Sequence, residues 1–141
     1  PLVAHFTIQV PSFASFAGKR LITPDYLFGT AQKQAFADKD RKYPVYFRYA
    51  FAEVDNVNIK IPAGFTVENL PRQQDASLPY ARYQSLIKFD GQKISNHRAL
   101  LLGQNFFPLE KYQELKGFFS KVETGDEQQA VLQKGVTSAQ K

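Results

Sequence analysis

The sequence predicts a mainly β domain: an antiparallel, immunoglobulin-like β-sandwich with one C-terminal α-helix packed against it. Several segments alternate apolar and polar residues with period two, which is typical of strands that bury one face. Turn residues such as Pro-Ala-Gly and Asp-Gly separate these segments. Apolar residues recur at spacings of three and four only after Pro108. Because strand and helix patterns do not alternate along the chain, a sandwich is favoured over a parallel α/β fold.

The composition is that of one globular domain. The chain has 141 residues, of which 43% are hydrophobic and 22% charged, so it is long enough to bury a core. Thirteen Phe and seven Tyr, with no Trp, predict aromatic rings packed between sheets. We expect one domain over residues 1–134 and a flexible tail over residues 135–141. Since residue 1 is Pro rather than Met, we expect the chain to be excised from a longer protein, with any targeting signal elsewhere.

The first elements are two extended segments. Leu2–Val10 alternates with period two and predicts a half-buried strand. Its more apolar side consists of Leu2, Ala4, Phe6, Ile8 and Val10. Arg20–Pro24 predicts a second, shorter extended piece.

The segment Tyr43–Arg72 predicts the centre of the sandwich. Asp55-Asn56 predicts a turn or bulge between two extended runs. Pro62-Ala63-Gly64 predicts a tight turn, because Pro presets φ and Gly tolerates positive φ. The residues expected to face the core are Val45, Phe47, Tyr49, Phe51, Val57, Ile59 and Ile61.

A hairpin and a helix are expected to follow. Asp90-Gly91 between two β-patterned runs predicts a hairpin turn. The apolar face of that hairpin would hold Tyr83, Ile87, Phe89, Ile94 and Leu100. The apolar spacing after Pro108 predicts a helix over about residues 108–123, since Pro suits a first helical turn. A short strand that includes Val131 and Leu132 would end the domain.

The residue types needed for catalysis or metal binding are scarce. The chain has no Cys, which excludes thiolate chemistry. It has two His, whereas a zinc site usually takes three or four protein ligands. His5 and His97 are interpreted as ordinary strand residues. Glu53 and Asp55 could form an acid pair or bind Ca²⁺, but they fit solvated turn carboxylates better, because the dense oxygen pattern of a calcium loop is missing. No Gly-x-Ser-x-Gly or phosphate-binding motif is present. We expect no catalytic residues, no metal and no cofactor.

The charge pattern does not favour a nucleic-acid partner. The formal net charge is +5, but the basic residues are scattered from Lys19 to Lys141 rather than gathered on one segment. A nucleic-acid surface requires a one-sided basic patch. No apolar run approaches the ~20 residues of a membrane span. We therefore predict neither a nucleic-acid partner nor a membrane span.

Aromatic residues are the candidates for a binding surface. Tyrosines exposed on a β face can bind glycans or peptides, although tyrosine is also common in strands for structural reasons. Phe106 and Phe107 precede the helix, where they could form a hydrophobic staple or an aromatic platform. The candidate binding-surface residues are Tyr43, Tyr46, Tyr49, Tyr80 and Tyr83.

Four segments carry a family resemblance. They are RKYPVYF at Arg41–Phe47, IPAGFTVENLPR at Ile61–Arg72, SLP at Ser77–Pro79 and the helical segment with its following strand at Phe106–Leu132. In this order they resemble the C-terminal domain of large bacterial proteins built around a transglutaminase-like module. The matching motifs are Tyr43-Pro44, Pro62–Pro71, Phe107–Phe118 and Asp126–Leu132.

The resemblance implies a domain context rather than an activity. In that family an N-terminal β-rich domain precedes a papain-like transglutaminase core, and a β-sandwich closes the chain. The Cys-His-Asp machinery belongs to the preceding domain, and none of it maps onto this sequence, which has no Cys. The resemblance also implies a periplasmic or extracellular location.

Two hypotheses follow. In the first, the chain is a non-catalytic accessory sandwich whose partner is the upstream transglutaminase-like domain of the same protein. In the second, it is a recognition module of the cell envelope that binds a glycan or a protein.

Overall fold

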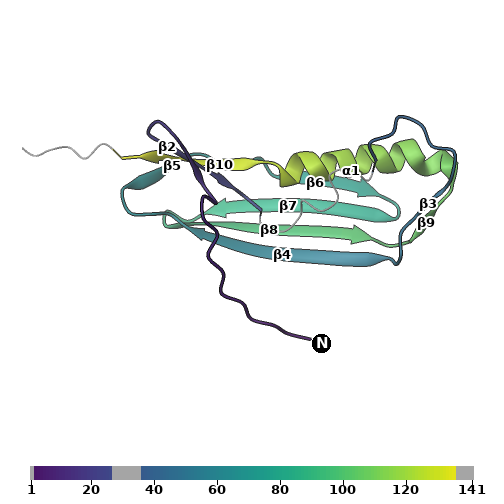
Figure 1. The fold of residues 1–141 in the computed structure, drawn as a ribbon, viewed down its shortest axis with the longest axis horizontal. Coiled ribbons are helices and arrows are strands. Elements are labelled where there is room, and N and C mark those ends of the chain that lie inside the picture. The colour runs from purple at the N-terminus through teal and green to yellow at the C-terminus, as the bar shows by residue number, and fades with distance from the viewer. Residues whose placement is uncertain (1, 27–35, 136–141) are drawn as a thin grey trace, which may run out of the picture.

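The computed structural model describes residues 2–26 and 36–135. The chain folds into two layers (Figure 1). The first layer is an antiparallel sheet whose strands follow the spatial order β4-β8-β7-β6. These strands are β4 (Phe51–Lys60), β8 (Lys93–Leu102), β7 (Ala81–Phe89) and β6 (Gln74–Leu78). The mainly β fold with antiparallel sheets and one C-terminal helix is thus confirmed.

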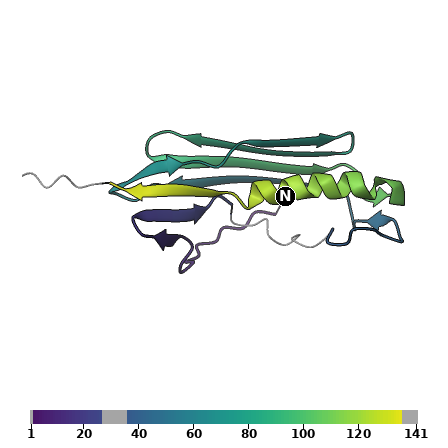
Figure 2. The ribbon, with the colours of Figure 1, turned by 90° about the horizontal axis from the view of Figure 1, so that it is seen from above.

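The second layer is half sheet and half helix. A four-stranded sheet in the order β1-β2-β10-β5 covers one half of the large sheet. Its strands are β1 (Ser15–Ala17), β2 (Arg20–Pro24), β10 (Gln129–Lys134) and β5 (Phe65–Asn69). Helix α1 (Tyr112–Asp126) covers the other half and continues into β10 after two residues, so helix and strand run along the molecule as one line (Figure 2).

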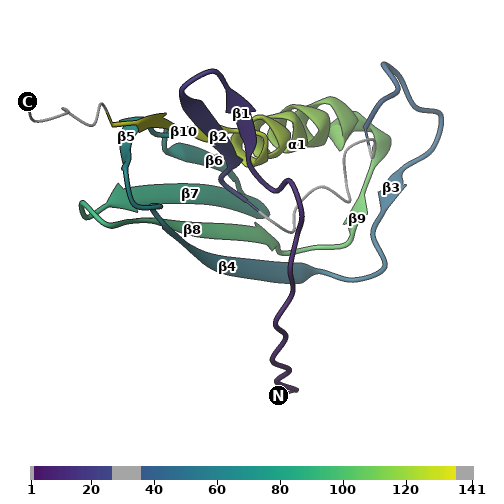
Figure 3. The ribbon, with the colours of Figure 1, turned by 60° about the vertical axis from the view of Figure 1, so that its left-hand side comes forward.

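A short ribbon closes one end of the molecule. Strand β3 (Val45–Tyr46) pairs antiparallel with β9 (Phe106–Phe107). Figure 3 shows this ribbon beyond the ends of β4 and β8, below the start of α1. After Pro108 a 3-10 turn at Leu109–Lys111 leads directly into α1. The helix proper therefore begins a turn later than Pro108, and it ends at Asp126.

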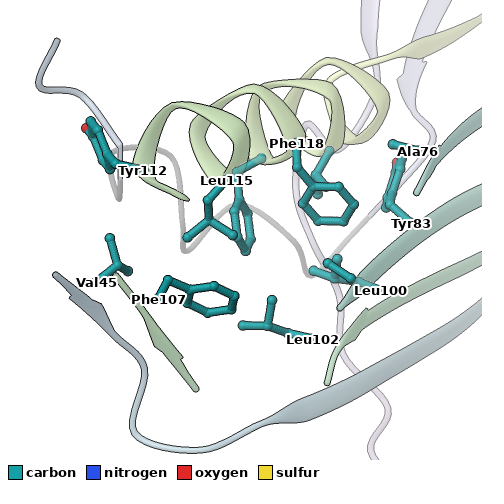
Figure 4. Packing of buried hydrophobic residues seen from close by; sticks show 12 residues of the cluster. Val45, Ala76, Tyr83, Leu100, Leu102, Phe107, Tyr112, Leu115 and Phe118 are labelled. Atoms are coloured by element: carbon teal, nitrogen blue, oxygen red, sulfur yellow. The ribbon is translucent and has the colours of Figure 1, made fainter. Parts of the chain in front are cut away.

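The core consists of two clusters on the inner face of the large sheet. The cluster beneath α1 is shown in Figure 4 and includes Tyr83, Leu100, Leu102, Phe107, Leu115 and Phe118. The cluster beneath the small sheet is formed by Ile87, Ile94, Ala130 and Leu132. Strand alternation places both sets on one face, as expected for a half-buried sheet. Between the clusters, β7 and β8 direct Ser85, Asn96 and Arg98 inward, and all three are buried.

Two turn predictions are confirmed. Gly91 adopts φ 94° between β7 and β8, and Asp90 Oδ1 accepts hydrogen bonds from the backbone N–H groups of Gln92 (3.0 Å) and Lys93 (2.9 Å). Gly64 adopts φ 81°, and the Phe65 N–H donates to the Pro62 carbonyl at 3.1 Å. Both glycines occupy the left-handed region, which a side chain would make costly.

The prediction of a turn or bulge at Asp55-Asn56 is wrong. Both residues lie inside β4, which runs unbroken to Lys60 and pairs along its whole length with β8. Side chains from elsewhere satisfy the two polar groups: the Tyr26 hydroxyl donates to Asp55, and Asn56 Oδ1 lies 2.8 Å from His97 Nδ1. These tertiary partners override the local turn preference.

The alternating segment from Tyr43 to Phe51 is also interrupted. It forms strand only at β3 and then again from Phe51. Tyr49 lies in the break and is exposed rather than part of the core. The strand is interrupted because its two parts pair with different strands: β3 pairs with β9, whereas β4 pairs with β8.

The first segment is not a paired strand. Residues Leu2–Val10 carry no strand assignment, and every one of them is exposed. The tail predicted for residues 135–141 lies, apart from Gly135, outside the described residues. No helix in the described ranges combines the length and the apolar character needed to cross a bilayer.

Candidate functional site

Three of the five predicted tyrosines lie on the surface at one end of the molecule. The exposed fractions are 76% for Tyr43, 69% for Tyr46 and 63% for Tyr49. Tyr46 belongs to β3, and the other two lie three residues before and after it. The short ribbon therefore presents aromatic side chains to solvent at the end where β4 begins.

The ribbon alternates between core and surface. Val45 is opposite Phe107, and both are buried; Tyr46 is opposite Phe106, and both are exposed. Because directly opposite residues on a strand pair have neighbouring side chains, the exposed side chains of Tyr46 and Phe106 are neighbours on the outer face of the ribbon. We call Tyr43, Tyr46, Tyr49 and Phe106 the terminal aromatic surface. The sequence allows two interpretations of Phe106 and Phe107, a hydrophobic staple or an aromatic platform. In the structure Phe107 packs into the core, whereas Phe106 faces outward.

Tyr83 does not belong to a binding surface, which corrects that part of the prediction. It lies on the inner face of β7, is fully buried, and donates its hydroxyl hydrogen to Asp126 Oδ1 at 2.8 Å. Burial and then the charge of Asp126 raise the pKa of its hydroxyl. The period-two pattern had already placed Tyr83 on the apolar face of the hairpin, and that face is the one directed into the core.

Tyr80 is only partly exposed and is engaged within the fold. Its ring lies 5.0 Å from the Phe107 ring between centroids, and its hydroxyl donates to Glu114 Oε1 at 2.8 Å. Burial and this hydrogen bond raise the pKa of Tyr80 to about 12. Tyr80 thus anchors α1 to the large sheet, so it is not grouped with the exposed tyrosines.

A buried polar cluster lies between the two halves of the core. Its centre is Arg98 on β8, with 3% of the residue exposed. Arg98 Nε and Nη2 donate to the two carboxylate oxygens of Asp126 at 2.7 and 2.8 Å. Nη1 lies 3.4 Å from both Glu53 and Asp55 on the neighbouring strand β4. We call Arg98 with Asp126, Glu53, Asp55, Tyr26 and Tyr83 the Arg98 network.

Two tyrosine rings complete the surroundings of the guanidinium group. Its central carbon lies 4.6 Å from the Tyr26 ring centroid and 5.6 Å from that of Tyr83, within the range of cation–π attraction. Burial alone would lower the pKa of Arg98, but the hydrogen bonds and the charge of Asp126 outweigh it and raise the pKa. Burial, followed by the hydrogen bond to Asp55, raises the pKa of Tyr26.

A second buried carboxyl group lies beside the Arg98 network. Asp25 follows β2 directly, and its Oδ2 accepts a hydrogen bond from Asn96 Nδ2 at 2.8 Å. Asn96 Nδ2 also donates to the Asp25 carbonyl, at 3.3 Å. Asp25 Oδ1 has no hydrogen-bond partner among the described residues. Burial raises the pKa of Asp25 to about 6, because the ionised form is costly away from water.

The Arg98 network is suited to holding elements together rather than to catalysis. A catalytic group must reach a substrate, whereas the guanidinium group is enclosed by its carboxylates and by two rings. The network joins β8, β4, β7, the end of α1 and Tyr26, the second residue after β2. Removing one partner of such a buried ion pair strongly destabilises the folded state, because the other charge stays buried without compensation.

Sequence reasoning missed Arg98 and Asp126 and underrated Asp55. One pattern would have indicated Arg98: in Lys93–Leu102 it shares the inward face with Ile94 and Leu100. A charged residue on an otherwise apolar strand face requires a buried partner. That partner, Asp126, lies 28 residues away in sequence, so local periodicity does not identify it.

The histidines and the open depressions do not form a further site. His97 lies on the outer face of β8 beside Asn56, and His5 lies in the exposed N-terminal segment. Within residues 2–26 and 36–135, no group of three His, Cys, Asp or Glu side chains could hold a metal ion. An open depression of about 620 Å³ lies between the two turns, Pro62–Gly64 and Asp90–Gly91. It is bordered by Lys60, Asp90 and Lys93, and no enclosing wall brings catalytic groups together.

Comparison with known proteins gives a family and a fold. A family profile described as "Domain of Unknown Function with solved-structure structure (DUF3858)" matches residues 19–132. A crystal structure described as that of a "putative protease" from Parabacteroides distasonis ATCC 8503 superimposes with a TM-score of 0.66 at 13% sequence identity. The match covers 81% of this chain and 23% of that chain, so this chain spans under a quarter of its structural relative. No curated protein sequence matches the chain at a significant level.

Proposed function

The chain belongs to the family of domains of unknown function DUF3858, and on this premise we propose that it is a non-catalytic accessory domain of a longer bacterial transglutaminase-like protein. Its role is to support the catalytic domain of that protein. One observation carries the proposal: the fold recurs as 23% of a longer chain described as a "putative protease". The segments that resemble the C-terminal domain of transglutaminase-like proteins give the proposal its more specific form.

The arrangement of the polar groups agrees with an accessory role. Arg98, Tyr26, Tyr83 and Asp25, whose pKa values are raised by their surroundings, lie inside the fold and hold its layers together. The exposed face of the large sheet carries uncharged polar ladders, such as Ser95 with Asn58 at 2.8 Å. The proposal includes a periplasmic or extracellular location, which follows from the family resemblance alone.

The first test separates support from catalysis. Chain 1–141 is assayed for amide hydrolysis and for transamidation, and we expect no turnover above the buffer rate. The longer protein is then compared with a form that lacks this domain. We expect the shortened form to lose activity or to unfold at a lower temperature. Turnover by the isolated chain, or full activity and stability without the domain, would overturn the proposal.

A second candidate function is recognition of a glycan or an envelope protein. The terminal aromatic surface favours it, because rigid aromatic side chains give large contact area at low entropic cost. The test is binding of chain 1–141 to a glycan array and to envelope extracts. The matched comparison is the Tyr43→Ser, Tyr46→Ser, Tyr49→Ser triple variant, which changes only exposed residues. We expect captured ligands to be lost in the triple variant; equal capture by both proteins would exclude this surface.

A further inference from the structure

The N-terminal segment Leu2–Val10 has the pattern of a strand but pairs with nothing in the described part of the chain. Its apolar side holds Leu2, Ala4, Phe6, Ile8 and Val10. Leu2 is 98% exposed and Phe6 84% exposed. Figures 1 and 3 both show the segment leaving the body of the domain and projecting past β4.

The composition of this segment is that of a strand in contact with another structure. Phe, Ile, Val and Thr favour strands, and residues 2–10 contain no Asp, Glu, Lys or Arg. Exposed strands normally carry charges or prolines that prevent unwanted pairing, whereas residues 2–10 contain neither. A continuous exposed apolar row marks an interaction site.

The connection to the domain is short and bent. Only Pro11–Ala14 separate the segment from β1, and Ser12 adopts φ 57°, which is uncommon for a residue other than Gly. Phe16 on β1 is also exposed, and its ring lies 6.4 Å from the Phe65 ring between centroids. The C-terminal end of the segment, at Val10, is therefore held close to the β1–β2 hairpin.

A second copy of this chain is a poor partner. Among the outermost strands, only β4 is long enough, with ten residues, whereas β1, β5 and β6 have three, five and five. The inward row of β4 contains Glu53 and Asp55, which are committed to Arg98. An apolar row placed beside it would lie against two carboxylates, which is unfavourable.

We propose that Leu2–Val10 is a β-strand that adds to the apolar sheet edge of a neighbouring domain in the longer protein. Strand addition satisfies the backbone groups of the segment and gives its apolar row a surface to cover. Two observations support a partner outside the domain itself. The family match begins at residue 19, beyond the segment, and the structural relative is several times longer than this chain. The inference rests on the proposed function only in placing the chain in a longer protein, and it does not depend on catalysis there.

The test is amide hydrogen exchange, measured on chain 1–141 and on the longer protein. Paired strands exchange slowly because exchange requires local or global opening. We expect the amides of residues 3–10 to exchange without protection in chain 1–141, and about 100-fold or more slowly in the longer protein. Equally fast exchange in both would overturn the proposal. Protection that appears in chain 1–141 together with a dimer mass would also overturn it in favour of a second copy.

Two variants of the longer protein test the apolar row. Phe6→Asp places a charge on the proposed contact side, and Gln9→Asp places the same charge on the opposite side. We expect Phe6→Asp to remove the protection of residues 3–10 and Gln9→Asp to retain it. If Phe6→Asp does not fold, Phe6→Ala is used, and it should reduce the protection about 10-fold or more. Protection that survives both Phe6 substitutions would contradict the proposal.

The exchange result can be separated from the catalytic one. Residues 3–10 could be protected in the longer protein while the form that lacks this domain remains fully active. That outcome would support the proposed strand pairing and reject the accessory role. Conversely, the form that lacks this domain could lose activity while residues 3–10 of the longer protein exchange without protection. That outcome would support the accessory role and reject the proposed strand pairing.

Discussion

Arg98 and Asp126 form a bidentate ion pair that ties the middle of the large sheet to the last turn of α1. The two hydrogen bonds measure 2.7 and 2.8 Å, and both side chains are nearly enclosed. Charge-assisted fork-to-fork pairs are directional as well as strong. The pair therefore fixes where the helix ends over the sheet.

Replacing Arg98 should strongly destabilise the fold. Arg98→Met retains apolar volume but leaves Asp126 buried beside Asp55 without a cation. We expect a loss of about 3–5 kcal/mol in the free energy of unfolding, measured by urea denaturation. Arg82→Met is the matched control, since Arg82 is exposed and lies 3.8 Å from Asp75; it should change stability by less than about 1 kcal/mol. Equal losses in the two variants would show that the buried pair has no special role.

Asp25 should make the stability depend on pH. Its pKa is about 6 in the folded protein against 3.8 for the free side chain. The stability contributed by the neutral carboxyl group is therefore fully present below about pH 4 and is lost as the pH rises through about 6. Asp25→Asn cannot ionise. We expect this variant to gain up to about 3 kcal/mol relative to the wild type between pH 4 and pH 7.

The measurement for Asp25 is a series of urea denaturations at pH 4, 5, 6 and 7. Taking the difference from wild type cancels the titration of all other groups. Asp75→Asn, at an exposed carboxylate, is the matched control, and its difference from wild type should vary by less than about 0.5 kcal/mol. A difference for Asp25→Asn that stays constant over this pH range would contradict a buried, titrating carboxyl group.

The two glycines of α1 should respond in opposite directions to alanine. A Cβ on Gly125 would collide with the Tyr83 hydroxyl group and ring, whereas a Cβ on Gly117 would meet open space. Gly125→Ala should cost about 1–3 kcal/mol by overpacking. Gly117→Ala should stabilise the protein by up to about 1 kcal/mol through helix propensity. Thermal unfolding of the two variants provides the comparison, and a stabilised Gly125→Ala would show that Tyr83 moves aside.

The neighbouring phenylalanines of β9 should differ sharply in their contributions. Phe107 is fully buried against Phe47 and Tyr80, so Phe107→Ala should cost about 3–5 kcal/mol. Phe106 is exposed, and Phe106→Ala should cost less than about 1 kcal/mol. Urea denaturation of both variants tests this division. A large loss from Phe106→Ala would mean that the terminal aromatic surface is part of the core.

Local patterns were sufficient where neighbouring residues decide the structure. Asp90-Gly91 predicted its hairpin because the Asp side chain and the Gly backbone form the turn between them. The spacing after Pro108 predicted α1 because an apolar helix face is visible in sequence. In both cases the determining contacts lie within a few residues.

Distant partners explain what the sequence did not predict. Asp55 lies within a strand because Tyr26 and Arg98 hold its side chain there. Arg98 could not be assigned a partner, since Asp126 reaches it through the packing of α1. Leu2–Val10 has the pattern of a strand, but pairing requires a second strand that the pattern does not specify.

The continuity of α1 with β10 has a consequence for the order of folding. One C-terminal segment, Tyr112–Lys134, supplies the helix over one half of the large sheet and one of the two inner strands of the small sheet over the other. During synthesis the hairpin of β7 and β8 emerges first, with its apolar face uncovered. The domain therefore cannot close before its last strand has left the ribosome, and until then a nascent chain exposes a surface prone to aggregation.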